Sequence, residues 1–485
     1  MRYYFPVFAV LGGVLVLFAL TMAVPAAFAW LGGDGTLGHF ALAALLTLAT
    51  GLALFFGCRR PRRELQPRDG FLLVTAVWTV LPAFGMLPLL LAVPGLSVTD
   101  AYFESMSGLT STGATALSGL DALPRAVNVW RCFMVLLGGL GVVVLAVAIL
   151  PLLGVGGSQM FKAETPGPMK DAKLTPRIAE TARALWFIYV LMALACCLAY
   201  RLAGMGWADA FMHMCTTVSL GGFSPYDASL GHFDSPLIEG VAIVFMLLSG
   251  VSFTLYFLAW QRGSLKPLLH DLEARGWIAL MAGAVALVTV VLLVHGTYPS
   301  VGEALRHAAF NVISVASTTG YSSTDYGQWP VFAPILMLFL CGFATSAGST
   351  GGGIKLMRSI LLLKQARREL TRIVHPRAVA PVTVRGQVVD AQVLFSVLAF
   401  MLIYGSVIII ATLLLLASGL DVVSAFTAVV ACINNTGPGL GQVGPAGNFQ
   451  GLNDFQTWVC TACMLLGRLE LFAVLVLFTR GFWRK

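Results

Sequence analysis

The chain has 485 residues, of which 58% are hydrophobic and only 11% are charged. Soluble domains carry about a quarter charged residues, and disordered chains need few apolar residues, so both classes are excluded. The net charge of +8 does not indicate nucleic-acid binding, because the basic residues lie in short segments between apolar runs. The composition therefore predicts a polytopic membrane protein.

Ten apolar segments are long enough to cross a bilayer core, which takes about 20 helical residues. The first should be a retained membrane helix, because its apolar run exceeds the roughly 7–15 residues of a signal-peptide core. The ten expected spans are residues 4–30, 38–57, 71–93, 126–152, 182–203, 236–260, 276–296, 330–362, 391–417 and 455–479.

Basic residues follow every even-numbered span. The positive-inside rule therefore predicts that both termini are cytoplasmic. The first two basic linkers contain Arg59, Arg60, Arg62, Arg63 and Arg68, and then Lys162, Lys170, Lys173 and Arg177.

Four segments remain on the outer side, and each begins with an apolar stretch too short to cross a bilayer. Each then continues into a polar run that contains glycine, which is typical of a re-entrant segment. Non-helical backbone at membrane depth survives only where protein or water covers it, so these segments suggest one shared aqueous pathway. They are residues 97–120, 206–230, 301–325 and 421–445.

An internal repeat relates the four segments. A single Thr-Gly pair would be ordinary turn chemistry, but four glycines at one position of one hydropathy unit indicate a repeat. Each glycine follows an alanine by twelve residues: Gly113 and Ala101, Gly222 and Ala210, Gly320 and Ala308, Gly437 and Ala425.

We therefore expect an all-α membrane protein with two additional N-terminal helices and four repeats, each made of a helix, a short pore helix, a loop and a second helix. The N-terminal helices and a basic linker take residues 1–70. The repeats take residues 71–180, 181–275, 276–390 and 391–485, and the third has a broken second helix.

The short helix of each repeat should end just before its glycine. The carbonyl groups there carry partial negative charge, and glycine lets the neighbouring backbone turn toward a common axis. Such carbonyls can replace the water shell of a cation, and the lack of carboxylates in these runs favours a monovalent one. The predicted ion ligands are Ser111, Thr112, Gly113, Leu220, Gly221, Gly222, Thr318, Thr319, Gly320, Asn435, Thr436 and Gly437.

Other polar or reactive residues of the chain are weaker candidates. Glu104, His213 and Asn311 should satisfy backbone groups behind the loops. Cys460 and Cys463 form a C-x-x-C without a second cysteine pair, so core packing is expected rather than zinc or redox chemistry.

The eighth span contains a run of small residues that should unwind, because each glycine costs about 1 kcal/mol in a helix. Unwound backbone here could obstruct the pathway, with Gly348, Gly351, Gly352 and Gly353 as hinges followed by Lys355. The alternative is a kink packed against small residues.

Arg468 lies inside the last span, so it must face the interior of the bundle. An ion pair with Glu470 is disfavoured, because positions two apart do not share a helix face. A contact with the unwound segment or the pathway is expected instead.

The sequence resembles the TrkH family of bacterial potassium-uptake subunits, within the superfamily of the Ktr and HKT transporters. The resemblance rests on residues 110–114, 219–224, 317–321, 434–439, 347–355 and 467–470. It implies a pseudo-fourfold arrangement of the repeats around one pore, an intramembrane gating loop beside Arg468, and a location in the cell inner membrane. It also implies a homodimer, a cytosolic nucleotide-binding partner similar to TrkA, no cofactor, and K⁺ as the transported ion.

Three functions are compatible with the sequence to different degrees. A gated, cation-selective pore for potassium leads. A proton- or sodium-coupled potassium symporter is the alternative, although such proteins usually show intramembrane carboxylates and inverted repeats. A membrane enzyme is disfavoured, because no H-E-x-x-H or G-x-S-x-G motif lies in the spans.

Overall fold

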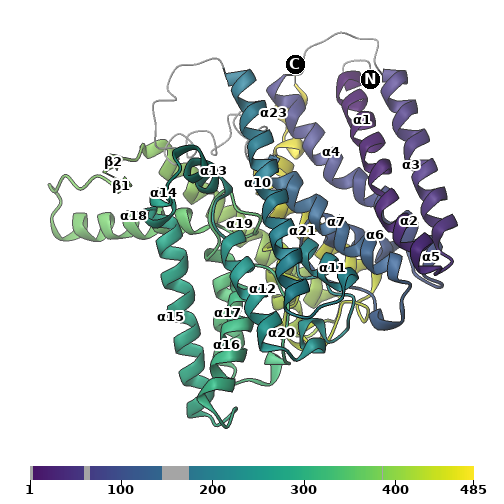
Figure 1. Ribbon diagram of the computed structural model, residues 1–485. Coiled ribbons are helices and arrows are strands. Elements are labelled where there is room, and N and C mark those ends of the chain that lie inside the picture. The colour runs from purple at the N-terminus through teal and green to yellow at the C-terminus, as the bar shows by residue number, and fades with distance from the viewer. Residues whose placement is uncertain (1–3, 59–65, 145–173, 385, 485) are drawn as a thin grey trace.

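The computed structural model describes residues 4–58, 66–144, 174–384 and 386–484, and these form a helical bundle (Figure 1). Six of the described helices are long and apolar enough to cross a membrane, or eight if two bent helix pairs each count as one span. Both chain termini lie at the same end of the bundle. The basic residues Arg59, Arg60, Arg62, Arg63, Lys162, Lys170 and Lys173 fall outside the described residues.

The N-terminal part consists of α1 (Phe5–Thr21), α2 (Ala23–Gly32) and α3 (Leu37–Cys58). Two glycines let α1 and α3 pack closely, because a Cβ on Gly12 would lie only 2.7 Å from the main-chain oxygen of Gly51. Small residues at such a crossing let two backbones approach, as in other membrane helix pairs. These helices stand at one edge of the molecule (Figure 1).

The rest of the chain repeats one pattern four times. Repeat 1 comprises α4 (Pro67–Gly85), α5 (Leu87–Ala92), α6 (Val98–Leu109), η2 (Leu120–Ala122) and α7 (Arg125–Val144). Repeat 2 comprises α10 (Leu174–Leu202), α11 (Trp207–Val218), η4 (Ser229–Phe233), α12 (Pro236–Ser249) and α13 (Phe253–Arg262).

Repeats 3 and 4 follow the same order. Repeat 3 comprises α14 (Lys266–Leu269), α15 (Leu272–Val294), α16 (Val301–Ala316), η5 (Tyr326–Gln328), α17 (Phe332–Phe343) and α18 (Leu356–Val374), and a hairpin of β1 (Thr383–Val384) and β2 (Gln387–Val388) follows. Repeat 4 comprises α19 (Ala391–Ala417), α20 (Val422–Ile433), η6 (Gly441–Val443), α21 (Asp454–Arg468), α22 (Phe472–Leu475), η7 (Val476–Phe478) and α23 (Arg480–Trp483).

The short helices α6, α11, α16 and α20 all end in the core, and three of them begin at a side-chain cap, whereas α11 begins at Gly206 without one. Ser97, Ser300 and Asp421 accept hydrogen bonds from backbone N–H groups in the first turns of α6, α16 and α20. The hydrogen bond from Ser424 N lowers the pKa of Asp421 below its usual value. The four alanines that lie twelve residues before the repeated glycines are completely buried, so each short helix packs closely along this face: Ala101, Ala210, Ala308 and Ala425.

Two spans that the sequence predicts as continuous are broken. The 236–260 span bends by 83° between α12 and α13, and the 455–479 span bends by 105° after α21. In the second case Glu470 and Leu471 adopt φ values of 53° and 55°, which an α-helix cannot contain.

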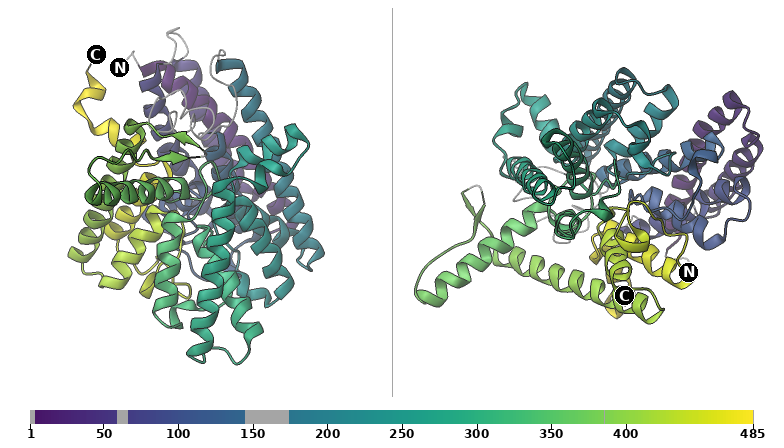
Figure 2. Two further views of the ribbon diagram at one scale, coloured as in Figure 1. Left: turned by 90° about the vertical axis from the view of Figure 1, so that its left-hand side faces the viewer. Right: turned by 90° about the horizontal axis from the view of Figure 1, so that it is seen from below.

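The 330–362 span has the break that its small residues predict, but its second part does not continue across the bundle. Helix α17 ends at Phe343, and α18 starts only at Leu356 and projects sideways from the bundle (Figures 1 and 2). Charged residues such as Arg358 and Lys364 on α18 explain why it does not complete an apolar crossing. The part of the expected 126–152 span beyond Val144 lies outside the described residues.

Candidate ion pathway

The loops after the four short helices share an unusual backbone. We call them the ring loops and define them as residues 110–114, 219–224, 317–321 and 434–439. Each has a non-glycine residue in the left-handed region two positions before its glycine, a conformation that such residues rarely adopt. The φ values are 51° at Ser111, 53° at Leu220, 64° at Thr318 and 54° at Asn435.

The ring loops contact one another in a closed circle. The glycine of each loop faces a main-chain oxygen of the next loop, so closely that a Cβ would collide with it. Glycine also supplies the positive φ, which lies between 56° and 96° at these four positions. The four contacts join Gly113 to Gly221, Gly222 to Thr319, Gly320 to Thr436, and Gly437 to Thr112.

A cavity of about 330 Å³ lies over one face of the circle. All four ring glycines line it. Arg131 and Asp227 are the charged residues of its lining. The circle of backbone groups therefore borders a space large enough for water and small ions.

Polar side chains support the ring loops from behind. Glu104 accepts a hydrogen bond from Ala116 N at 2.9 Å, and Asn311 accepts one from Ser323 N at 3.2 Å. Each bond joins residues twelve positions apart, so the first and third repeats use the same hydrogen bond. Both side chains satisfy a backbone N–H group, as expected. His213 differs, because its Nε2 lies 3.3 Å from a side-chain oxygen, that of Ser224.

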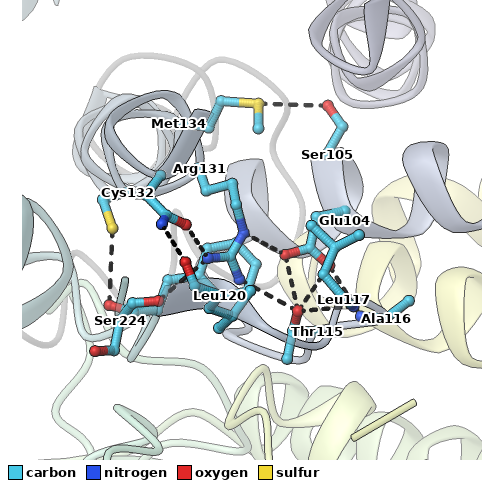
Figure 3. A network of polar contacts seen from close by, with 12 residues as sticks. Glu104, Ser105, Thr115, Ala116, Leu117, Leu120, Arg131, Cys132, Met134 and Ser224 are labelled. Atoms are coloured by element: carbon cyan, nitrogen blue, oxygen red, sulfur yellow. Dashed lines mark hydrogen bonds and ion pairs between the residues drawn. The ribbon is translucent and has the colours of Figure 1, made fainter. Parts of the chain in front are cut away.

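Arg131 is a further residue of this network, and it is not among the residues predicted from the sequence. Its side chain is completely buried and forms an ion pair with Glu104, with 2.7 Å between Nε and Oε1 (Figure 3). An arginine inside the apolar 126–152 segment is itself a signal for a buried partner or site.

The 344–355 segment packs against the other face of the circle. Gly352 N donates to the Thr318 hydroxyl at 3.0 Å, and the Thr350 hydroxyl donates to the carbonyl oxygen of Val218 at 3.1 Å. A Cβ on Gly352 would collide with the carbonyl oxygen of Asn434. The segment thus contacts the ends of α11, α16 and α20, and none of its residues lines the 330 Å³ cavity.

The other predicted hinge residues also lie in this segment. Gly348 and Gly353 have φ values of 75° and 81°. The carbonyl oxygen of Gly348 accepts a hydrogen bond from Phe253 N at 3.1 Å, at the bend between α12 and α13. Lys355 is buried and donates to the carbonyl oxygen of Gly351.

Arg468 connects this segment to the first ring loop. Its guanidinium donates to the carbonyl oxygen of Thr350 at 2.9 Å and to the hydroxyl of Ser111 at 3.1 Å. The side chain is buried. Glu470 forms an ion pair with Arg358 of α18 instead.

This architecture defines a class: a multi-span helical membrane protein built from four re-entrant loop units. The chain belongs to the TrkH family of cation transport proteins, whose family model matches residues 38–484. This is a family of transport proteins rather than enzymes. The resemblance suggested by the motifs and the all-α polytopic fold are thereby confirmed.

Individual relatives agree over their whole length. The chain is 46% identical to the "Trk system potassium uptake protein TrkH" of Vibrio parahaemolyticus over 479 residues, with 98% of each chain covered. It is 45% identical to the protein of that name from Escherichia coli K12, again over 98% of both. The crystal structure of the potassium transporter TrkH from Vibrio parahaemolyticus matches with a TM-score of 0.92 at 43% identity and covers 100% of both chains.

Proposed function

We propose that this chain is a membrane subunit for potassium uptake, in which K⁺ crosses a gated pore through the ring loops. The observation that carries the proposal is the closed circle of glycine-to-carbonyl contacts among the four loops. Relatives that match over nearly their full length are named as potassium uptake proteins.

Main-chain oxygens would select the ion. The ring loops contain no carboxylate, and the C-terminal ends of four short helices supply partial negative charge near them. A cage of neutral oxygens suits a monovalent cation. The proposed ligands are the oxygens of Ser111, Thr112, Gly113, Leu220, Gly221, Gly222, Thr318, Thr319, Gly320, Asn435, Thr436 and Gly437.

The 344–355 segment would act as the gate, and its present position would be the closed one. Support comes from its contacts with the ends of three short helices and from two cations, Lys355 within the segment and Arg468 beside it. Positive charge on the path would repel K⁺. Gly348, Gly351, Gly352 and Gly353 would provide the freedom to move.

The cellular setting of the proposal follows from the family resemblance and, for the two termini, from the basic linkers. The chain would lie in the cell inner membrane with both termini in the cytoplasm. It would form a homodimer, and a TrkA-like nucleotide-binding subunit would control the gate. Uptake would draw on the membrane potential, which contributes about 2.3 kcal/mol per charge for each 100 mV.

Ion flux into liposomes under a clamped voltage tests the proposal. The purified chain should carry potassium and rubidium inward at an inside-negative voltage, and sodium much more slowly. A proton or sodium gradient should drive no uptake when the voltage is zero. Uptake driven by such a gradient would favour the coupled symporter, and equal potassium and sodium fluxes would overturn the selective filter.

A further inference from the structure

The ion pair of Glu104 and Arg131 lies directly behind the first ring loop. Both side chains are completely buried, and Figure 3 shows them facing each other. Glu104 also accepts hydrogen bonds from the backbone of Ala116 at 2.9 Å and from the hydroxyl of Thr115 at 3.0 Å. The carboxylate therefore holds the chain two and three residues after Gly113.

The same guanidinium reaches the second ring loop. Nη1 of Arg131 donates to the carbonyl oxygen of Ser224 at 3.1 Å and to Asn128 Oδ1 at 3.0 Å. Its guanidinium carbon lies 4.5 Å from the centre of the Phe223 ring, which follows Gly222. One planar group thus connects the chain segments that follow Gly113 and Gly222, the glycines of two neighbouring ring loops.

The buried ion pair occurs only between the first and second ring loops in the part of the chain that the structure describes. The positions equivalent to Glu104 hold His213, Asn311 and Ala428 in the other repeats. In the described part of the chain, no other ion pair contacts a ring loop. Apolar residues of similar volume would fill the space at least as well, so stability alone does not account for buried charges here.

We infer that Arg131 and Glu104 are positioning residues for ion selection, which fix the spacing between the first and second ring loops. The inference rests on the proposed function. Arginine suits this task because its rigid fork can meet a carboxylate, two carbonyl oxygens and a hydroxyl at set angles. Shifting one loop would move its oxygens relative to the ion, and the preference for potassium would fall.

Arg131→Lys tests the inference, with Arg306→Lys as a matched control. Lysine keeps the charge but cannot reproduce the fork. Arg306 also forms an ion pair between two repeats, at 2.7 Å from the buried carboxylate of Glu239. This pair contacts no ring loop. We expect Arg131→Lys to lower the potassium-to-sodium flux ratio in liposomes about tenfold, and Arg306→Lys to leave it unchanged.

Thermal melting in detergent accompanies each flux measurement. If Arg131→Lys does not fold, Glu104→Gln takes its place, because glutamine keeps one acceptor oxygen for Ala116 N and replaces the oxygen that faces Arg131 with an uncharged amide donor. A folded variant of either kind with the wild-type flux ratio would overturn the inference. A similar fall of the flux ratio in Arg306→Lys would also overturn the inference, since a general effect of ion pairs would then explain the results of both variants. A wild-type chain without potassium preference would instead refute the proposed function.

Discussion

The guanidinium of Arg468 and the main-chain oxygen of Thr350 lie 2.9 Å apart, although 118 residues separate them in the chain. The contact joins the end of α21 to the 344–355 segment of the preceding repeat. The same side chain reaches Ser111 of the first ring loop. A single buried cation therefore links the proposed gate to the proposed filter.

Replacing Arg468 with alanine should open the gate more often. A hydrogen bond from a charged group contributes about 1.5–3 kcal/mol, so its loss should raise the open population at least about tenfold. Basal potassium flux in liposomes, without any regulatory subunit, measures this. Arg372→Ala on α18 is the control, because Arg372 is half exposed and pairs only weakly with Glu369, at 3.8 Å. Equal flux in both variants would refute the contact's role.

Gly352→Ala should displace the same segment by steric means. A Cβ on Gly352 would collide with the carbonyl oxygen of Asn434, whereas one on nearby Gly342 would meet its neighbours at ordinary distances of 3.7 Å or more. We expect higher basal flux for Gly352→Ala and wild-type flux for Gly342→Ala. Wild-type flux in a folded Gly352→Ala protein would show that this close packing does not hold the gate shut.

Gly113→Ser should alter ion selection beyond the effect of backbone strain. A residue with a side chain costs roughly 1–2 kcal/mol in the left-handed region, and here a Cβ would also push against Gly221 of the second ring loop. Gly119→Ser carries the same strain, at φ 67°, but opens into free space. The potassium-to-sodium flux ratio should therefore fall about tenfold only in Gly113→Ser. A similar fall in both variants would assign the effect to strain alone.

The ring loops could be predicted because one local signal occurs four times. A glycine with an alanine twelve residues earlier marks each repeat, and the two positions have separate physical causes: close approach to a carbonyl, and complete burial. Arg468 could be singled out for a related reason, since charge inside an apolar span demands a partner.

Other features depend on contacts that a single sequence hides. The break after α21 places Glu470 and Leu471 at positive φ, although neither residue favours it. Nothing local marks that bend, and tertiary packing imposes it. Arg131 carried the same signal as Arg468, but its partner Glu104 lies 27 residues away and became visible only in the fold.

Tyr321→Phe should loosen the boundary between the second and third ring loops. The buried Tyr321 hydroxyl lies at hydrogen-bond distance from the Thr216 hydroxyl, from Thr217 Oγ1 at 3.1 Å and from the carbonyl oxygen of His213 at 3.2 Å, so the third loop is tied to α11. Removing the hydroxyl should lower the unfolding free energy by about 1 kcal/mol and reduce the potassium-to-sodium flux ratio.

Tyr256→Phe is the matched control for this change. Its hydroxyl donates one hydrogen bond, of 2.7 Å to the carbonyl oxygen of Leu248, at the bend between α12 and α13 and away from the ring loops. Both variants should lose some stability, because each gives up a hydroxyl group that is hydrogen-bonded to the protein. Only Tyr321→Phe should lose ion preference, since only its hydroxyl holds a ring loop. If flux ratios and melting temperatures change in parallel in both variants, the tie at Tyr321 serves the fold and not ion selection.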